Sequence, residues 1–90
     1  MEYQRLVNKL RCGRIEAEIS LGQSQGGTWY YNTRVFRPFT DPDTGEAKRA
    51  YSFGHDDMPH VIDITTRADA WIREQLANQK TVTLGRMEAL

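Results

Sequence analysis

The stretch TWYYNTRVFR, residues 28–37, alternates like a long β-strand, and its two faces differ in character. Successive side chains of a strand point to opposite sides of a sheet, so every second residue shares a face. One face suits a core, whereas the other interleaves aromatic rings with an arginine, which a ligand-binding sheet would use. The core face is formed by Trp29, Tyr31, Thr33 and Val35, and the second face by Tyr30, Asn32, Arg34 and Phe36.

Two further strands are predicted on either side of this stretch. Residues 14–21 alternate strictly between polar and apolar side chains, which is typical of a half-buried antiparallel strand. A glycine-rich loop joins them to the central strand, and a turn rich in Pro, Asp and Gly leads to a third strand at 47–53. This third strand leaves two alternatives open, because Tyr51 and Phe53 either pack in the core or extend the aromatic face of the central strand.

A long helix is predicted to follow, running to about residue 78. Asp56 or Asp57 can cap its start, and proline is accepted in its first turn. Apolar residues recur every three or four positions and should cover the sheet: Met58, Val61, Ile62, Thr65, Ala68, Ile72 and Leu76. Ile64 and Trp71 widen this arc beyond what one small sheet needs. We therefore expect a homodimer in which Ile64, Ala68 and Trp71 contact the helix of a second copy.

These elements predict an α+β fold, in which a three- to four-stranded antiparallel β-meander is followed by one long α-helix packed on the sheet. Ninety residues make a single domain, with its core at about 13–78. Residues 1–12 are expected to form a short helix, an extended arm or an extra strand, and residues 79–90 a tail or a strand. A fourth strand would come from 6–12 or from 81–84.

The composition indicates an ordinary soluble chain, with 39% apolar and 27% charged residues. No apolar run approaches the roughly 20 residues of a membrane span, and the polar N-terminus does not resemble a signal peptide, so we expect a cytoplasmic location. The single Cys12 cannot form an internal disulfide. The formal net charge is zero, although residues 1–40 carry six basic and three acidic residues and residues 41–90 carry six and nine.

Few residues indicate catalysis. His55, Asp56 and Asp57 resemble an acid/base or metal cluster, but adjacent aspartates at a helix start are more often caps, and His60 is the only other histidine. We expect no metal site, no cofactor and no catalytic residue. A small enzyme built on His55, Asp56 and Asp57 is a remote alternative.

The stronger pattern is the second face of the central strand. Single-stranded nucleic acid is bound by positive charge along the phosphates and by aromatic rings that stack on bases. The predicted binding residues are Tyr30, Asn32, Arg34 and Phe36, joined by Arg14, Lys48 and Arg49 from neighbouring strands. The alternative is that Tyr and Phe are simply good strand residues, with Arg lying over them in solvent.

The order of elements, with RVFRPF in the central strand and a capped helix at the end, resembles the Whirly and transcriptional-coactivator class of single-stranded-DNA-binding proteins. The motif TWYYNTRVFR…YSFGHDDM…ADAWI also resembles a group of small bacterial proteins of unassigned function. The resemblance covers roughly residues 13–75. It implies four strands curved over a helix, a dimer formed through the helices with Ile64 and Trp71 at the contact, and DNA on the open sheet face near Tyr30, Arg34 and Phe36.

Two functions therefore remain as hypotheses. The first is a non-catalytic module that binds single-stranded DNA or RNA through its aromatic and arginine-bearing sheet face. The second is a protein-interaction or assembly domain, in which that face or the Trp71 side of the helix meets another protein whose identity the sequence does not reveal.

Overall fold

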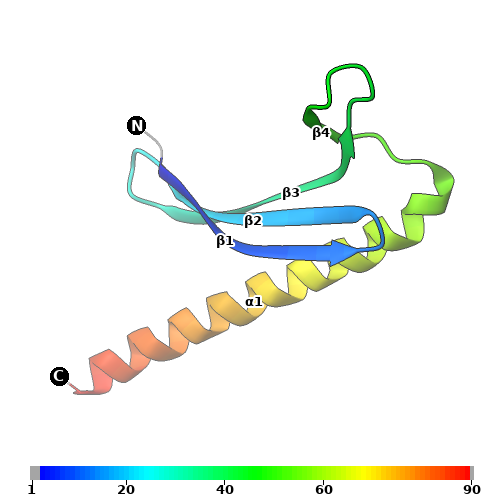
Figure 1. Cartoon of the computed structure of the whole chain (residues 1–90). Coiled ribbons are helices and arrows are strands. Elements are labelled where there is room, and N and C mark those ends of the chain that lie inside the picture. Colours follow the sequence, from blue (N-terminus) through cyan, green and yellow to red (C-terminus); the bar gives the residue numbers. More distant parts are fainter. Residues whose placement is uncertain (1–2, 90) are drawn as a thin grey trace.

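The computed structural model confirms the predicted α+β fold, a four-stranded antiparallel sheet followed by a helix packed on it (Figure 1). The structure describes the backbone of residues 3–89 and the side chains of residues 4–78. Strands β1 (Tyr3–Cys12), β2 (Ile15–Gln23), β3 (Trp29–Thr40) and β4 (Ala47–Ala50) are adjacent in the order in which they occur in the chain. A 3₁₀ turn, η1 (His55–Asp57), leads into α1 (Met58–Ala89).

The fourth strand comes from the N-terminal segment. β1 pairs with β2 through a tight turn at Gly13, whose φ of 59° favours glycine. The register shifts between Leu6 and Asn8, so Val7 is an extra residue in a β-bulge. This bulge breaks the alternation, which explains why Leu6, Val7 and Leu10 imitate helical spacing. The alternative of a short N-terminal helix is wrong, and residues 81–84 continue α1 instead of adding a strand.

The core lies between β2 and α1. Ile15, Ala17 and Ile19 of β2 are fully buried, as is Ile64 of α1. Half-buried side chains from every other part of the fold surround this cluster, namely Leu10, Cys12, Val35, Phe53 and Val61. β2 is therefore the one strand with both neighbours and a helix above it, and its strict alternation in sequence reflects that position.

The third strand is shorter than its pattern predicts. β4 ends at Ala50, and the chain then turns toward η1, so the alternation of 47–53 does not continue as one strand face. Phe53 packs against the core, whereas Tyr51 is exposed. The core alternative is therefore right for Phe53 alone, and Tyr51 follows the end of β4 and is exposed.

The side of α1 that faces the sheet is rotated from the predicted stripe, although Val61 and Ala68 of that stripe do pack in the core. Ile64 and Ala68 are buried against the chain's own sheet, and Trp71 packs edge-on against Tyr31 of β3 with ring centroids 6.0 Å apart. The predicted dimer contact through Ile64, Ala68 and Trp71 is therefore wrong for this arrangement. Several residues of the predicted covering stripe are exposed instead: Met58, Ile62, Thr65 and Leu76. The apolar arc of α1 is wide, and the sheet contacts Ile64 and Trp71 together with Val61 and Ala68.

Asp57 fixes the start of the helix. Its carboxylate accepts a hydrogen bond from the backbone N–H of Gly54 at 3.0 Å, so Asp57 supplies the N3 contact of a capping box, whereas Gly54 and not an aspartate occupies the N-cap position. The same carboxylate accepts two hydrogen bonds from the Arg14 guanidinium, at 2.7 and 2.9 Å. Arg14 lies in the turn between β1 and β2, so this ion pair ties the hairpin to the helix start. The guanidinium and the Gly54 N–H hold the pKa of Asp57 below its ordinary value.

The molecule is elongated. Its principal extents are 60 × 31 × 17 Å, and its Cα radius of gyration is 17.0 Å, against about 12 Å for a compact domain of this length. A 32-residue helix is about 48 Å long, so α1 runs well past the sheet (Figure 1). In the described part of the chain, no helix is sufficiently long and apolar to cross a membrane.

Replacement of Ile64 by alanine tests which side of α1 faces the sheet. Ile64 is fully buried, so Ile64→Ala should lower the free energy of unfolding by about 2–5 kcal/mol through lost burial and a cavity. Ile62 is 62% exposed, and Ile62→Ala should change it by less than about 0.5 kcal/mol. Urea unfolding of both variants gives the comparison, and equal losses would show that the helix is rotated relative to this structure.

The ion pair between Asp57 and Arg14 predicts that the free energy of unfolding falls at acid pH. Because the folded state lowers the pKa of Asp57, its stabilisation is present above the unfolded value of about 3.9 and is lost as the pH falls through the lower folded value. Asp57→Asn should lower stability at neutral pH and flatten the decline below about pH 4. Some dependence of the free energy of unfolding on pH should remain in this variant, because Lys48 lowers the pKa of Asp41 in the same way. The control is Asp56→Asn, since the Asp56 side chain is 88% exposed and should leave the profile unchanged.

Candidate functional site

One face of the sheet is left without a covering element in the described chain (Figure 1). The strand register identifies its side chains, because residues opposite each other in antiparallel strands point to the same side. We call this surface the uncovered face. It consists of Gln4, Leu6, Lys9 and Arg11 from β1, Glu16, Glu18 and Ser20 from β2, Tyr30, Asn32, Arg34 and Phe36 from β3, and Arg49 from β4.

Three predicted binding residues lie on this face and are accessible. Asn32 and Arg34 are exposed, and Tyr30 is half-buried, with its hydroxyl accepting a hydrogen bond from Gln4 Nε2 at 3.2 Å. Within residues 4–78, no hydrogen bond or ion pair joins the Arg34 guanidinium to another side chain, although Glu18 lies opposite it in the register. The Arg34 guanidinium is therefore available for an anionic ligand.

Phe36 lies on the uncovered face but is not accessible. Its side chain is only 2% exposed, because the Arg49 guanidinium lies over the ring at 4.1 Å from the centroid. Glu18 holds Arg49 there through two hydrogen bonds of 2.9 and 3.0 Å, and this carboxylate raises the pKa of Arg49. The prediction that Phe36 stacks on a base is therefore wrong, and Arg49 serves as its cover.

Two other predicted contacts lie elsewhere. Arg14 is committed to Asp57 at the hairpin turn, and that carboxylate raises the pKa of Arg14. Lys48 pairs with Phe39 in the register, on the side opposite Arg49, and forms an ion pair with Asp41 at 2.8 Å. The prediction that Arg14 and Lys48 join the aromatic face is wrong, since a strand adjacent in sequence contributes only alternate residues to one face.

The sequence did not identify Lys9 and Arg11 as part of this face. They come from β1, which was not assigned as a strand, and the register places them opposite Glu18 and Glu16. Basic side chains on β1 and β3 therefore flank the two acids of β2, and among the described side chains neither Lys9 nor Arg34 forms an ion pair. The uncovered face carries four basic side chains, Lys9, Arg11, Arg34 and Arg49, against the acids Glu16 and Glu18.

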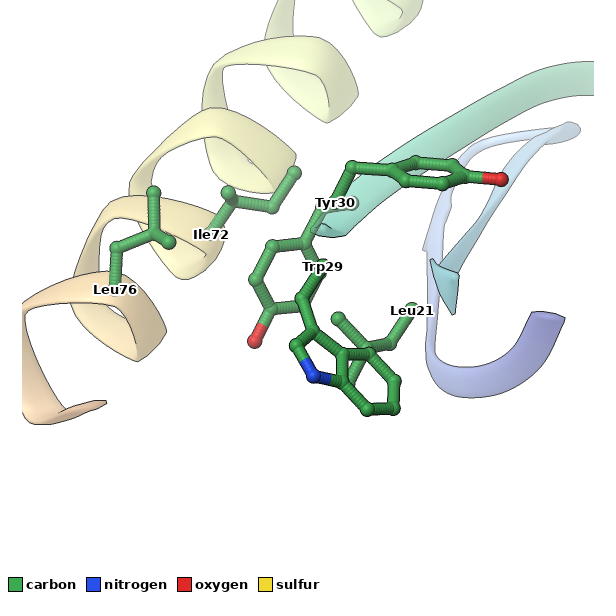
Figure 2. A pocket seen from close by; sticks show the side chains of 6 residues that line it. Leu21, Trp29, Tyr30, Ile72 and Leu76 are labelled. Carbon is green, nitrogen blue, oxygen red and sulfur yellow. The ribbon is translucent and has the colours of Figure 1, made fainter. Parts of the chain in front are cut away.

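A hollow of about 330 Å³ opens on the other side of β3, between that strand and α1. Figure 2 shows Ile72 and Leu76 projecting from α1, Leu21 and Trp29 lying together on the sheet, and Tyr30 pointing away from them. Trp29 is 54% exposed although it lies on the predicted core face. The core face of β3 is thus covered by the helix at Val35 and becomes open toward Trp29.

The acidic cluster at the helix start does not form a convergent site. Asp57 is buried against Arg14, whereas His55 and Asp56 are almost fully exposed and contact each other at 3.0 Å. Within the described side chains, no group of three or more His, Cys, Asp and Glu residues is arranged to hold a metal ion.

A contact that the sequence could not predict joins Cys12 to α1. Its Sγ lies 3.3 Å from Nδ1 of His60, and the His60 ring lies against Gly13, where a Cβ would come within 3.0 Å of it. A hydrogen bond to the Asp63 carboxylate, with burial, raises the pKa of the Cys12 thiol. The thiol is therefore kept protonated, which is unfavourable for a nucleophile.

Comparisons with known proteins give no relative. No family model matches the chain, and neither the curated proteins nor the solved structures contain a match. A function can therefore be inferred only from the geometry of the uncovered face.

The Cys12 environment can be tested by thiol reactivity. The rate of modification by a small thiol reagent should rise with a midpoint above the ordinary cysteine pKa of about 8.5, because the thiolate is the reactive species. Asp63→Asn removes the carboxylate that raises this pKa and should move the midpoint to lower pH. Asp69→Asn, which removes a partner of Arg73 elsewhere on α1, should not. An unchanged midpoint in Asp63→Asn would show that the carboxylate does not control the thiol.

Proposed function

We propose that the chain is a non-catalytic module that binds single-stranded nucleic acid on its uncovered face. The observation that carries the proposal is the exposed Arg34 guanidinium, which has no partner among the described side chains and lies two residues from Asn32 and four from Tyr30 on the same strand face. An extended strand of nucleic acid offers phosphates for the guanidinium and base faces for the tyrosine ring.

The charges of the face favour an anionic ligand locally, although the whole chain is neutral. Lys9 and Arg11 lie on β1, and Arg34 lies on β3, while the acids of β2 are each next to a basic side chain. Glu18 is already engaged with Arg49, so its charge is compensated. The remaining positive charge is modest, so we expect micromolar affinity that declines steeply with salt, as phosphate contacts release counterions.

The face favours a single strand over a duplex. It presents no helix in the described chain that could enter a groove, whereas unstacked bases can lie against a tyrosine ring. Asn32 and Gln4 supply amide groups beside that ring. The module is proposed to hold the ligand without chemistry on it.

The test is a fluorescence-anisotropy titration of a labelled single-stranded oligonucleotide at low and near-physiological salt, with the duplex as control. Arg34→Ala should weaken binding several-fold and reduce the slope of log K against log salt by about 0.7, the value for one phosphate contact on a single strand. Lys48→Ala is the matched control, because Lys48 lies on the opposite side of the sheet, paired with Asp41. It should leave affinity and slope unchanged.

Two results would contradict the proposal. Absence of binding at protein concentrations on the order of tens of micromolar, even at low salt, would remove it. Equal losses in Arg34→Ala and Lys48→Ala would show that the positive charge of the whole chain, and not this face, attracts the oligonucleotide. In either case a protein-binding role would become the leading hypothesis for the uncovered face.

A further inference from the structure

β3 has a long free edge. β4 pairs only with Arg37–Thr40, so on the side away from β2 the residues 29–36 have no strand beside them in the described chain. The backbone N–H and C=O groups that point outward along this edge are open to another strand. An edge of eight residues is longer than an average strand.

The two edges of the sheet differ in how they are protected. β1 carries the usual features that prevent edge pairing, namely a bulge at Val7 and the basic residues Arg5, Lys9 and Arg11. The free part of β3 has no bulge and no proline, and Arg34 is its only charged residue. Its other residues are mainly aromatic or β-branched, which are types that favour strand pairing. The β3 edge is therefore suited to pairing with another strand.

Exposed apolar side chains lie beside the same edge. Ile72 and Leu76 of α1 line the hollow with Trp29, which is 54% exposed, and Leu76 is 50% exposed. At 100° per residue, Met58 and Ile62 lie on the same side of α1 as Leu76, and both are exposed. Figure 2 shows Ile72 and Leu76 on the side of α1 that faces Trp29 of β3. Apolar side chains of a strand added to β3 could thus pack against the exposed apolar side of α1.

We propose that the free edge of β3 pairs with the same edge of a second copy of this chain, forming a two-fold symmetric dimer with one continuous sheet. Antiparallel pairing of a strand with itself is self-complementary, which is what a two-fold interface requires. This proposal does not depend on the nucleic-acid proposal. It also replaces the contact through Ile64, Ala68 and Trp71, which the fold has buried.

The geometry limits the register. With both helices on one side of the joined sheet, the two-fold axis is perpendicular to it, and opposing residues must share a face. In a first register the axis passes between the two copies of Asn32, and in a second register it passes between the two copies of Thr33. Arg34 lies opposite Tyr30 of the second copy in the first register and opposite Asn32 in the second, so the two arginines never oppose each other. The apolar stripes of the two α1 helices face each other in both registers.

The dimer can be tested by sedimentation equilibrium of the full chain and of two lysine variants. Thr33 is exposed and next to the axis in both registers, so Thr33→Lys places two like charges near each other and should weaken association at least tenfold. Leu6→Lys introduces the same charge at an exposed residue of the β1 edge and should leave the association constant unchanged. Circular dichroism confirms that both variants remain folded.

Cross-linking tests the register. In a Cys12→Ser background, oxidation of Asn32→Cys or Thr33→Cys should give a covalent dimer at whichever residue lies on the axis. Opposing Cα atoms in an antiparallel pair are roughly 4.5–5.5 Å apart, within the disulfide range of roughly 4.4–6.8 Å. Leu6→Cys in the same background should give none.

Three outcomes would overturn the proposal. They are a monomer at protein concentrations on the order of 100 micromolar, a dimer that Thr33→Lys does not weaken, and a dimer that cross-links at neither Asn32 nor Thr33. The first would leave the β3 edge as a site for a strand of another protein. A Thr33→Lys variant that is monomeric yet still binds oligonucleotide would separate the dimer from the nucleic-acid proposal.

Discussion

The carboxylate of Asp57 joins the β1–β2 hairpin to the start of the helix, next to the contact between Cys12 and His60. It receives the Arg14 guanidinium from the β1–β2 turn and the Gly54 N–H from the segment that enters the helix. Two sets of contacts place the helix on the sheet. The Asp57 contacts fix where the helix begins, and the burial of Ile64 and Ala68 beneath β2 fixes how the helix crosses the sheet.

One helix can cover only one face of a sheet, and this constraint determines where function can lie. β2 uses both of its neighbours and the helix, so its inward side chains are fixed by packing. β3 is less constrained, because the helix covers it at Val35 and diverges from it toward Trp29. β3 is therefore the strand with an uncovered face, a free edge and exposed aromatic side chains, and both proposals concern it for the same physical reason.

The sequence predicted the fold class because the alternation of residues 14–21 and 28–37 is strong and the helix has a recognisable start. It left β1 as one of several alternatives, because the bulge at Val7 interrupts the period on which strand assignment depends. It also could not predict which half of the helix arc faces the sheet, since Ile62 and Ile64 are equally apolar and only the tertiary contact distinguishes them. The placement of Tyr30, Asn32 and Arg34 on one face followed directly from strand geometry. The errors at Arg14 and Phe36 arose where a partner distant in sequence determined the side chain's position, whereas Lys48 lies on the opposite side of β4 from Arg49.

The acids of β2 explain why Arg34 and Arg49 have different roles although both lie on the uncovered face. Glu18 lies opposite Arg34 in the register but accepts both hydrogen bonds from Arg49, and it can pair with only one guanidinium in a two-point geometry. Arg49 takes that partner and gains the Phe36 ring beneath it, so releasing it would expose both a carboxylate and a buried aromatic side chain. Arg34 has no such constraint. In a β3-paired dimer its nearest cross-strand neighbours would be Tyr30 or Asn32 of the other copy, neither of which is acidic. Where the two β3 strands meet, the uncovered face would then carry Arg34 and Tyr30 of both copies with no carboxylate between them. Within one chain, by contrast, the basic residues of β1 and β3 lie next to the glutamates of β2. Dimerisation through β3 would therefore concentrate the positive charge that a neutral chain otherwise lacks.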